Sequence, residues 1–179
     1  MTGRNEMLEQ MVARLFADLA SGGARDWDPA GWLPHWSAIA QTGLPDLMRA
    51  EEVDGFGGGW VEMGAVCRAL GREGLALPVA ETILARHWLD RLGVPVTDGI
   101  DGFAIAEPLT EGPGDRVTVD IAAVPWGLSA GRVLLIGSGG GWWLLPVDAA
   151  EGRPGRNLDG DPRDGLRFVS APALAHGQL

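Results

Sequence analysis

The sequence predicts an α+β protein, in which an N-terminal all-α helical domain precedes a small antiparallel, β-barrel-like domain. Two changes of pattern support this prediction. Up to about residue 95, apolar side chains recur every three or four residues, as on the buried face of a helix. After that point glycine, proline and β-branched residues increase, and apolar residues alternate with polar ones, as in a half-buried strand. We therefore expect a helical domain at residues 1–95 and a β domain at residues 100–173.

Four helices are expected in the first domain. The second has the clearest boundaries: Asp28 can cap its N-terminus, Pro29 suits the first helical position, and Gly43 suits the C-terminal turn. The expected helices cover approximately residues 7–21, 28–43, 60–72 and 79–92.

The third expected helix contains the single cysteine of the chain, Cys67. It falls on the same apolar stripe as Met63, Val66 and Leu70, so we expect its side chain to fill the core. One cysteine excludes an intramolecular disulfide and cannot form a thiolate metal site alone.

In the β domain, the clearest strand covers residues 116–121, where two valines and an isoleucine alternate with polar residues. Two apolar runs, at residues 133–136 and 142–147, flank a Ser-Gly-Gly-Gly segment and predict two strands joined by a hairpin turn. A further strand is expected near residues 166–169.

The chain has eight tryptophans and no tyrosine. Trp32, Trp36 and Trp88 fall on helical core positions and are expected to be buried. Trp126 and the Trp142–Trp143 pair are less easily assigned to a core, so an interface or the stacking of a cofactor stays open for them.

Composition excludes several functions. Twenty-four acidic residues against fourteen basic ones give a net charge of −10, without a basic cluster, so nucleic acid and anionic membranes are not expected partners. The apolar runs are far shorter than the roughly 20 residues that cross a bilayer, and no secretory signal begins the sequence. We therefore expect a cytoplasmic protein.

Possible metal and phosphate motifs have the wrong spacing. Asp159, Asp161 and Asp164 lack the register of a calcium loop and predict a solvated turn. The loop at residues 55–60 ends in tryptophan where a dinucleotide-binding loop has its last glycine. The three histidines are far apart in sequence. No metal site is expected.

The order of four segments resembles the N-terminal helical domain of acyl-CoA dehydrogenases. In that family a helix ending in Gly-Leu leads to an acidic, glycine-rich loop, then to a helix ending in Leu-Gly-Arg, then to a helix that starts at a proline. The corresponding segments here are residues 39–47, 51–59, 62–73 and 77–82. The resemblance continues through the β part, to about residue 172.

The resemblance implies a β-barrel middle domain and a C-terminal helical bundle, with FAD bound between the two. In the family, a glutamate of the bundle removes a proton from an acyl-CoA and the flavin takes a hydride. This sequence ends where the bundle would begin. None of its glutamates matches the position of the family base, so no catalytic residue is assigned.

The family's flavin motif corresponds to residues 104–115, with changes. Ala106 replaces a hydroxyl residue, Pro113 and Gly114 alter the end of the motif, and the interval is longer. By motif position, Ala106, Leu109 and Thr110 are the candidate cofactor-binding residues. The family's later Lys-x-Trp-Ile-Thr segment has no match.

Two functions follow from the resemblance. The first is a truncated subunit that acts with an acyl-CoA dehydrogenase-like partner chain, which supplies the bundle for FAD-dependent α,β-dehydrogenation of an acyl-CoA; a homo-oligomer is a further possibility, because helix faces left by the absent bundle would be apolar. The alternative is a non-catalytic scaffold or binding protein that keeps the fold without flavin. Two further interpretations are a truncated gene product and an enzyme outside this family.

Overall fold

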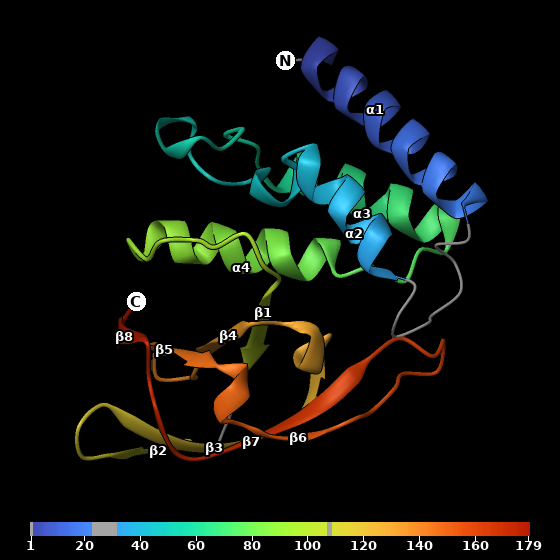
Figure 1. Cartoon of the computed structure of the whole chain (residues 1–179). Coiled ribbons are helices and arrows are strands. Elements are labelled where there is room, and N and C mark those ends of the chain that lie inside the picture. Colours follow the sequence, from blue (N-terminus) through green and yellow to red (C-terminus); the bar gives the residue numbers. More distant parts are fainter. Residues whose placement is uncertain (1, 23–31, 107–108) are drawn as a thin grey trace. The chain divides into compact units, whose positions relative to one another are not determined.

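The computed structural model describes residues 2–22, 32–106 and 109–179 (Figure 1). The chain divides into two compact units, residues 1–83 and 84–179, which we term the helical unit and the β unit. The predicted α+β class is confirmed, because in the described residues α-helices come first and strands follow. The division falls within the fourth helix, α4.

The helical unit contains α1, α2, α3 and the start of α4. Its core is formed by fully buried side chains from different helices, among them Phe16 of α1, Ile39 of α2 and Val66 of α3. Asp28 and Pro29, the predicted start of the second helix, lie outside the described residues. The helices span Thr2–Ser21, Trp32–Gln41, Trp60–Glu73 and Val79–Arg91, with 3-10 turns η1 at Leu44–Asp46 and η2 at Glu51–Val53.

The prediction that Cys67 fills the core is wrong, because its side chain is exposed. The buried face of α3 includes Ala65 and Ala69 together with Met63, Val66 and Leu70. Those alanines shift the buried arc away from Cys67, which lies beyond its edge. Sequence periodicity located the apolar stripe of this helix but placed its centre too close to Cys67.

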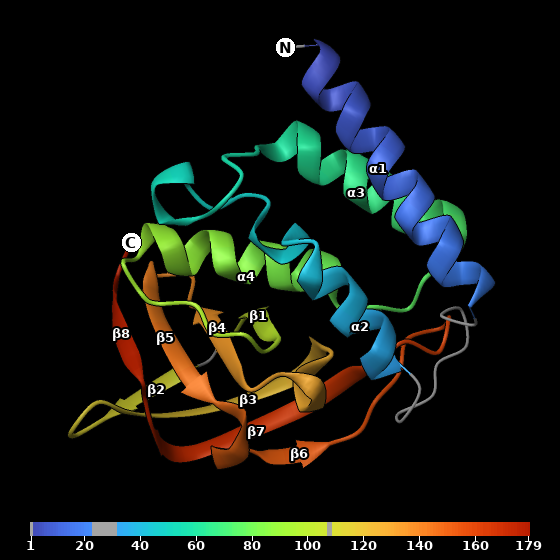
Figure 2. The ribbon, with the colours of Figure 1, turned by 45° about the horizontal axis from the view of Figure 1, so that its top comes forward.

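The β unit contains two four-stranded sheets that are not closed into a barrel (Figure 2). The first sheet has the order β1-β4-β5-β8, and the second has the order β2-β3-β7-β6. Neighbouring strands are antiparallel except for β1 and β4, which run parallel. The first sheet comprises Asp101–Ile105, Arg132–Ile136, Gly141–Pro146 and Ala175–Gln178; the second comprises Leu109–Gly112, Arg116–Pro125, Arg163–Pro172 and Glu151–Arg153.

The core of the β unit lies between the two sheets. Val119 of β3 and Phe168 of β7 pack there against Leu135 of β4. The opposite face of the first sheet is covered as well, since Leu134 and Leu144 pack with Leu89 of α4. The first sheet is therefore buried on both faces.

This double burial accounts for the Trp142–Trp143 pair that the sequence left open. Successive side chains of a strand point to opposite faces, so Trp142 packs on the α4 side and Trp143 on the side of the second sheet. Trp126 is only 3% exposed. All three belong to the core. Trp32 and Trp36 are buried as predicted, and Trp88 is partly buried against the core.

Candidate cofactor groove

The β unit has a groove of about 630 Å³ where the edge strand β2 of the second sheet faces the β4–β5 hairpin and β8 of the first. We term it the cofactor groove. Its wall combines apolar side chains, polar side chains and glycine backbone. The lining residues are Ala106, Leu109, Glu111, Gly137, Ser138, Gly139, Gly141, Trp143 and Gln178.

Two of the three candidate cofactor-binding residues line this groove. Ala106 follows β1 and is buried, and its N–H donates to the carbonyl of Ile136 at 3.2 Å. Leu109 begins β2 and lines the groove together with Glu111, two positions further along the strand. Thr110 lies between them, so strand alternation turns it to the other face, where it is exposed and is paired in register with Thr118.

The β4–β5 hairpin forms another part of the wall and confirms the predicted turn. The Gly137 N–H donates to the Gly141 carbonyl at 2.9 Å, and the Gly140 N–H donates to the Gly137 carbonyl at 3.1 Å. Gly140 has a φ of 81°, which favours glycine. A Cβ atom on Gly141 would lie 2.4 Å from the indole of Trp143. The indole therefore packs directly against the glycine backbone.

A side-chain contact joins the two sheets beside the strands that line the groove. His176 of β8 lies 3.1 Å from the carboxylate of Asp115 in the β2–β3 turn. The carbonyl of Asp115 also accepts the N–H of Ala173, at 3.0 Å. These contacts link the turn after β2 to β8, the strand that places Gln178 in the wall.

The cofactor groove fits a planar ring better than it fits all of FAD. Ala106, Leu109 and Trp143 offer an apolar surface, and Ser138 and Gln178 offer polar groups. FAD also carries a diphosphate, which needs positive charge or clustered donors. Glu111 is the single ionisable residue among the lining residues, and it is acidic. Among its described residues, the groove therefore has apolar and polar groups suited to a ring and no positive charge for a diphosphate.

Sequence reasoning missed most of the wall. The hairpin was predicted, but not that its glycines and Trp143 would meet β2, and Gln178 gave no signal at all. The tryptophan pair beside a glycine-rich turn is the sequence signal that could have indicated this wall, since the stacking of a cofactor is one interpretation of that pair. The missing information is the contact between β2, β4–β5 and β8, which are far apart in sequence.

Asp159 and Asp161 lie at a turn, as predicted, but the prediction is wrong for Asp164, which belongs to β7 and is only 4% exposed. The carboxylate of Asp164 accepts the N–H groups of Leu128 at 2.9 Å and Gly155 at 3.2 Å. The side chain of Asn157 accepts the N–H groups of Asp159 and Asp161. Across the described ranges, no three metal-binding side chains come together as a site.

None of the helices described is long and apolar enough to cross a membrane.

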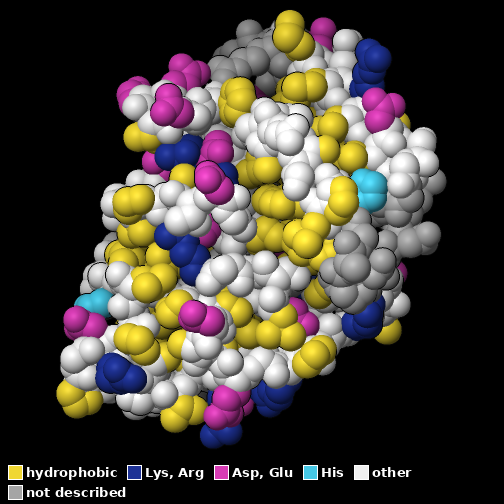
Figure 3. All heavy atoms as spheres, viewed as in Figure 1, with side chains coloured by type: hydrophobic (Ala, Val, Ile, Leu, Met, Phe, Trp, Pro, Cys, Tyr) yellow, Lys and Arg dark blue, Asp and Glu magenta, His cyan; other side chains and the backbone are white. Residues whose placement is uncertain are grey.

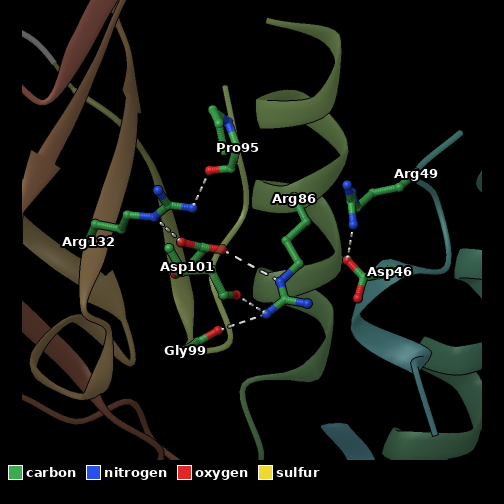
Figure 4. Close-up of polar contacts among 8 residues, drawn as sticks. Asp46, Arg49, Arg86, Pro95, Gly99, Asp101 and Arg132 are labelled. Atoms are coloured by element: carbon green, nitrogen blue, oxygen red, sulfur yellow. Dashed lines mark hydrogen bonds and ion pairs between the residues drawn. The ribbon is translucent and has the colours of Figure 1, made fainter. Parts of the chain in front are cut away.

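A buried charge cluster in the β unit has a structural role (Figure 4). Asp101 of β1 lies between Arg132 of β4, at 2.6 Å, and Arg86 of α4, at 3.5 Å. Arg86 also donates to the carbonyls of Thr97 and Gly99. The cluster joins α4, the segment after it and the first sheet, and its three side chains do not line the cofactor groove.

The fold defines the class of protein. A helical unit followed by a unit of two open sheets is consistent with the first two domains of an acyl-CoA dehydrogenase, although the sheets do not close into the β-barrel that the resemblance implies. The profile of the family "Acyl-CoA dehydrogenase, N-terminal domain" matches residues 2–95. The chain belongs to the acyl-CoA dehydrogenase family, which confirms the resemblance seen in the sequence.

Solved structures share this fold at low sequence identity. A variant of the Tcur3481–Tcur3483 steroid ACAD matches with a TM-score of 0.74 and 18% identity, over 98% of this chain and 57% of that one. The ChsE4–ChsE5 complex from Mycobacterium tuberculosis matches with a TM-score of 0.71 and 16% identity, over 93% and 54%. PigA with FAD and proline matches with a TM-score of 0.72 and 12% identity, over 100% of this chain and 59% of that one.

These likenesses establish the fold alone. The chain spans 54–59% of the length of these three structures. No curated protein matches the sequence.

Proposed function

We propose that this chain is a subunit of a flavin-dependent enzyme of the acyl-CoA dehydrogenase type. The cofactor groove forms one wall of the FAD site, and a partner chain of the same family supplies the helical bundle that completes it. The observation that supports this proposal is the position of the groove, where the family's flavin motif meets the β4–β5 hairpin through Ala106 and Leu109.

The charge of the cofactor groove supports the need for a partner. Because none of the described lining residues is a lysine or an arginine, we expect the cations or backbone donors for the diphosphate of FAD to come from another chain. Two of the similar structures are named for pairs, Tcur3481–Tcur3483 and ChsE4–ChsE5. A two-chain assembly is consistent with both observations.

In this proposal the chain binds and shields the ring. Bound FAD would supply the acceptor for a hydride taken from an acyl-CoA. Ala106, Leu109 and Trp143 would shield the ring from water, and Ser138 and Gln178 would offer it hydrogen bonds. The catalytic base comes from the partner's bundle.

The acidic residue in the wall favours a second candidate. Glu111 repels a diphosphate, so a scaffold that has kept the fold without flavin is the alternative. Under this alternative the chain still binds a partner, but the complex is colourless and turns over no acyl-CoA.

One experiment separates the two candidates. The chain is co-expressed with candidate partner chains of the same family, purified through a tag on this chain, and examined by absorbance spectroscopy. We expect a two-chain complex with bound flavin that is bleached on addition of an acyl-CoA. A stable complex without flavin absorbance would contradict the proposal and favour the scaffold.

A further inference from the structure

The helical unit has its own apolar groove, on the side of α1 that faces η1 and the loop before α3. Its volume is about 210 Å³. We term it the methionine groove. It belongs wholly to the helical unit and shares no residue with the cofactor groove. The lining residues are Met7, Leu8, Met11, Thr42, Leu44, Leu47, Phe56, Gly58 and Glu62.

The methionine groove has a buried floor and an exposed apolar edge. Leu44 and Leu47 are 2% and 4% exposed, whereas Met7, Met11 and Phe56 are 72%, 45% and 45% exposed. Exposed apolar side chains gathered around a cavity are typical of interaction sites. Methionine side chains are flexible and adapt to the surface that they meet.

Backbone contacts hold the loop side of the groove in place. The N–H groups of Gly57 and Gly58 donate to the carbonyls of Arg49 and Leu47, both at 2.8 Å. A Cβ atom on Gly58 would lie 2.7 Å from the Leu47 carbonyl oxygen, so glycine permits this close approach. On the other side, the Glu62 carboxylate accepts the Gly59 N–H at 2.9 Å at the start of α3. The groove is formed before any partner binds.

The size of the groove favours anchoring side chains over a whole ligand. Pockets for drug-sized ligands and cofactors measure about 300–1,000 Å³. At about 210 Å³ the methionine groove is smaller. It suits the apolar side chains of a larger partner.

The charge around the groove selects the kind of partner. Glu51, Glu52 and Asp54 are exposed on the segment just before Phe56, and Glu62 lines the groove itself. Figure 3 shows acidic side chains gathered over this end of the helical unit, at the upper left of the view. An acidic rim disfavours acyl-CoA and fatty acids, which are anionic. It also disfavours a second copy of a chain with net charge −10.

The shape of the apolar edge favours a helix. Met7 and Met11 are one turn apart on α1 and form a ridge on its surface. A second helix can pack its own side chains against such a ridge, as amphipathic helices do in hydrophobic grooves. We propose that the methionine groove binds an amphipathic helix of a partner protein, with apolar residues in the groove and flanking lysines or arginines at the acidic rim. This proposal goes beyond the flavin site and holds whether or not that site is completed.

The test uses two synthetic helical peptides with the same leucine stripe, one flanked by lysines and the other by glutamates. Binding to the full chain is measured by fluorescence anisotropy. We expect the lysine peptide to bind, its affinity to fall with added salt, and the glutamate peptide to bind far more weakly. Equal binding of both peptides would overturn the proposal.

Two variants locate the binding site. Met11→Gln keeps the charge and removes an apolar contact, so it should weaken binding of the lysine peptide by about tenfold. Leu33→Gln is the control, because Leu33 is 53% exposed on α2 and does not line the groove. Circular dichroism verifies that both variants are folded. Wild-type affinity of Met11→Gln for the lysine peptide would contradict the proposal. The proposal would also be contradicted if the wild-type chain self-associates and Met11→Gln abolishes that association while Leu33→Gln does not.

Discussion

Asp101 has no exposed surface and interacts with two arginines. Arg132 also donates to the carbonyl of Pro95, and Arg86 donates to the carbonyls of Thr97 and Gly99, in the segment between α4 and β1. Removal of one member of such a buried cluster leaves uncompensated charge in a medium of low dielectric constant. The carboxylate therefore holds α4 against the first sheet within the β unit.

Asp101→Ala should lower the free energy of unfolding by about 3–5 kcal/mol, because two buried guanidinium groups would face each other without the carboxylate. Urea denaturation measures the loss. Asp120→Ala is the matched control: it removes an ion pair with Arg153 in which both side chains are more than half exposed. The control should cost at most about 1 kcal/mol. Equal losses in the two variants would show that the cluster is not buried as described.

Cys67 is exposed on α3, yet the protein around it affects its reactivity. Burial of part of the thiol raises its pKa above the ordinary value, the negative charge of Glu81 raises it further, and Arg68 lowers it. Since the thiolate is the reactive form, a raised pKa slows alkylation near neutral pH.

Opposite changes of charge should therefore change the rate of Cys67 alkylation in opposite directions. Glu81→Gln lowers the pKa of the thiol and should speed its reaction with iodoacetamide at neutral pH. Arg68→Gln raises the pKa and should slow it. The full pH profile of the rate separates a shift in pKa from a change in access. Two profiles that shift in the same direction would refute this electrostatic account.

At the scale of elements, strands with strong alternation or long apolar runs were predicted, and short polar ones were not. The predicted strands correspond to β3, β4, β5 and β7. The strands β1, β2, β6 and β8 have three to five residues each, and each contains a glycine, so no period is visible in them. Their pairing partners determine their conformation.

The β4–β5 hairpin allows a steric test of the groove wall. Gly141→Ala would place a methyl group against the Trp143 indole and should cost about 1–3 kcal/mol of stability. Gly139→Ala is the matched control on the same turn, because its Cβ would meet nothing within 4 Å. The control should change stability by no more than about 0.5 kcal/mol. Urea denaturation of both variants checks the difference, and a costly Gly139→Ala would contradict this description of the hairpin.

At the scale of the whole molecule, the order of the segments was the most informative property of the sequence. The helical and β parts, the family and two residues of the groove wall could be predicted from residue patterns. The rest of the wall could not, because Ser138, Trp143 and Gln178 reach the groove through strand pairing and sheet stacking. Such contacts leave no local signal in one sequence.

The central claim is that the cofactor groove forms one wall of a flavin site in a two-chain enzyme. Leu109→Trp would place a larger side chain in the groove, where the ring is proposed to lie, whereas Val169→Trp adds the same side chain on an exposed position of β7, where Val169 is 54% exposed. The decisive measurement is the flavin absorbance of the partner complex purified with each variant. We predict that the Val169→Trp complex retains flavin and that the Leu109→Trp complex forms without it. Full flavin absorbance in the Leu109→Trp complex would contradict the account.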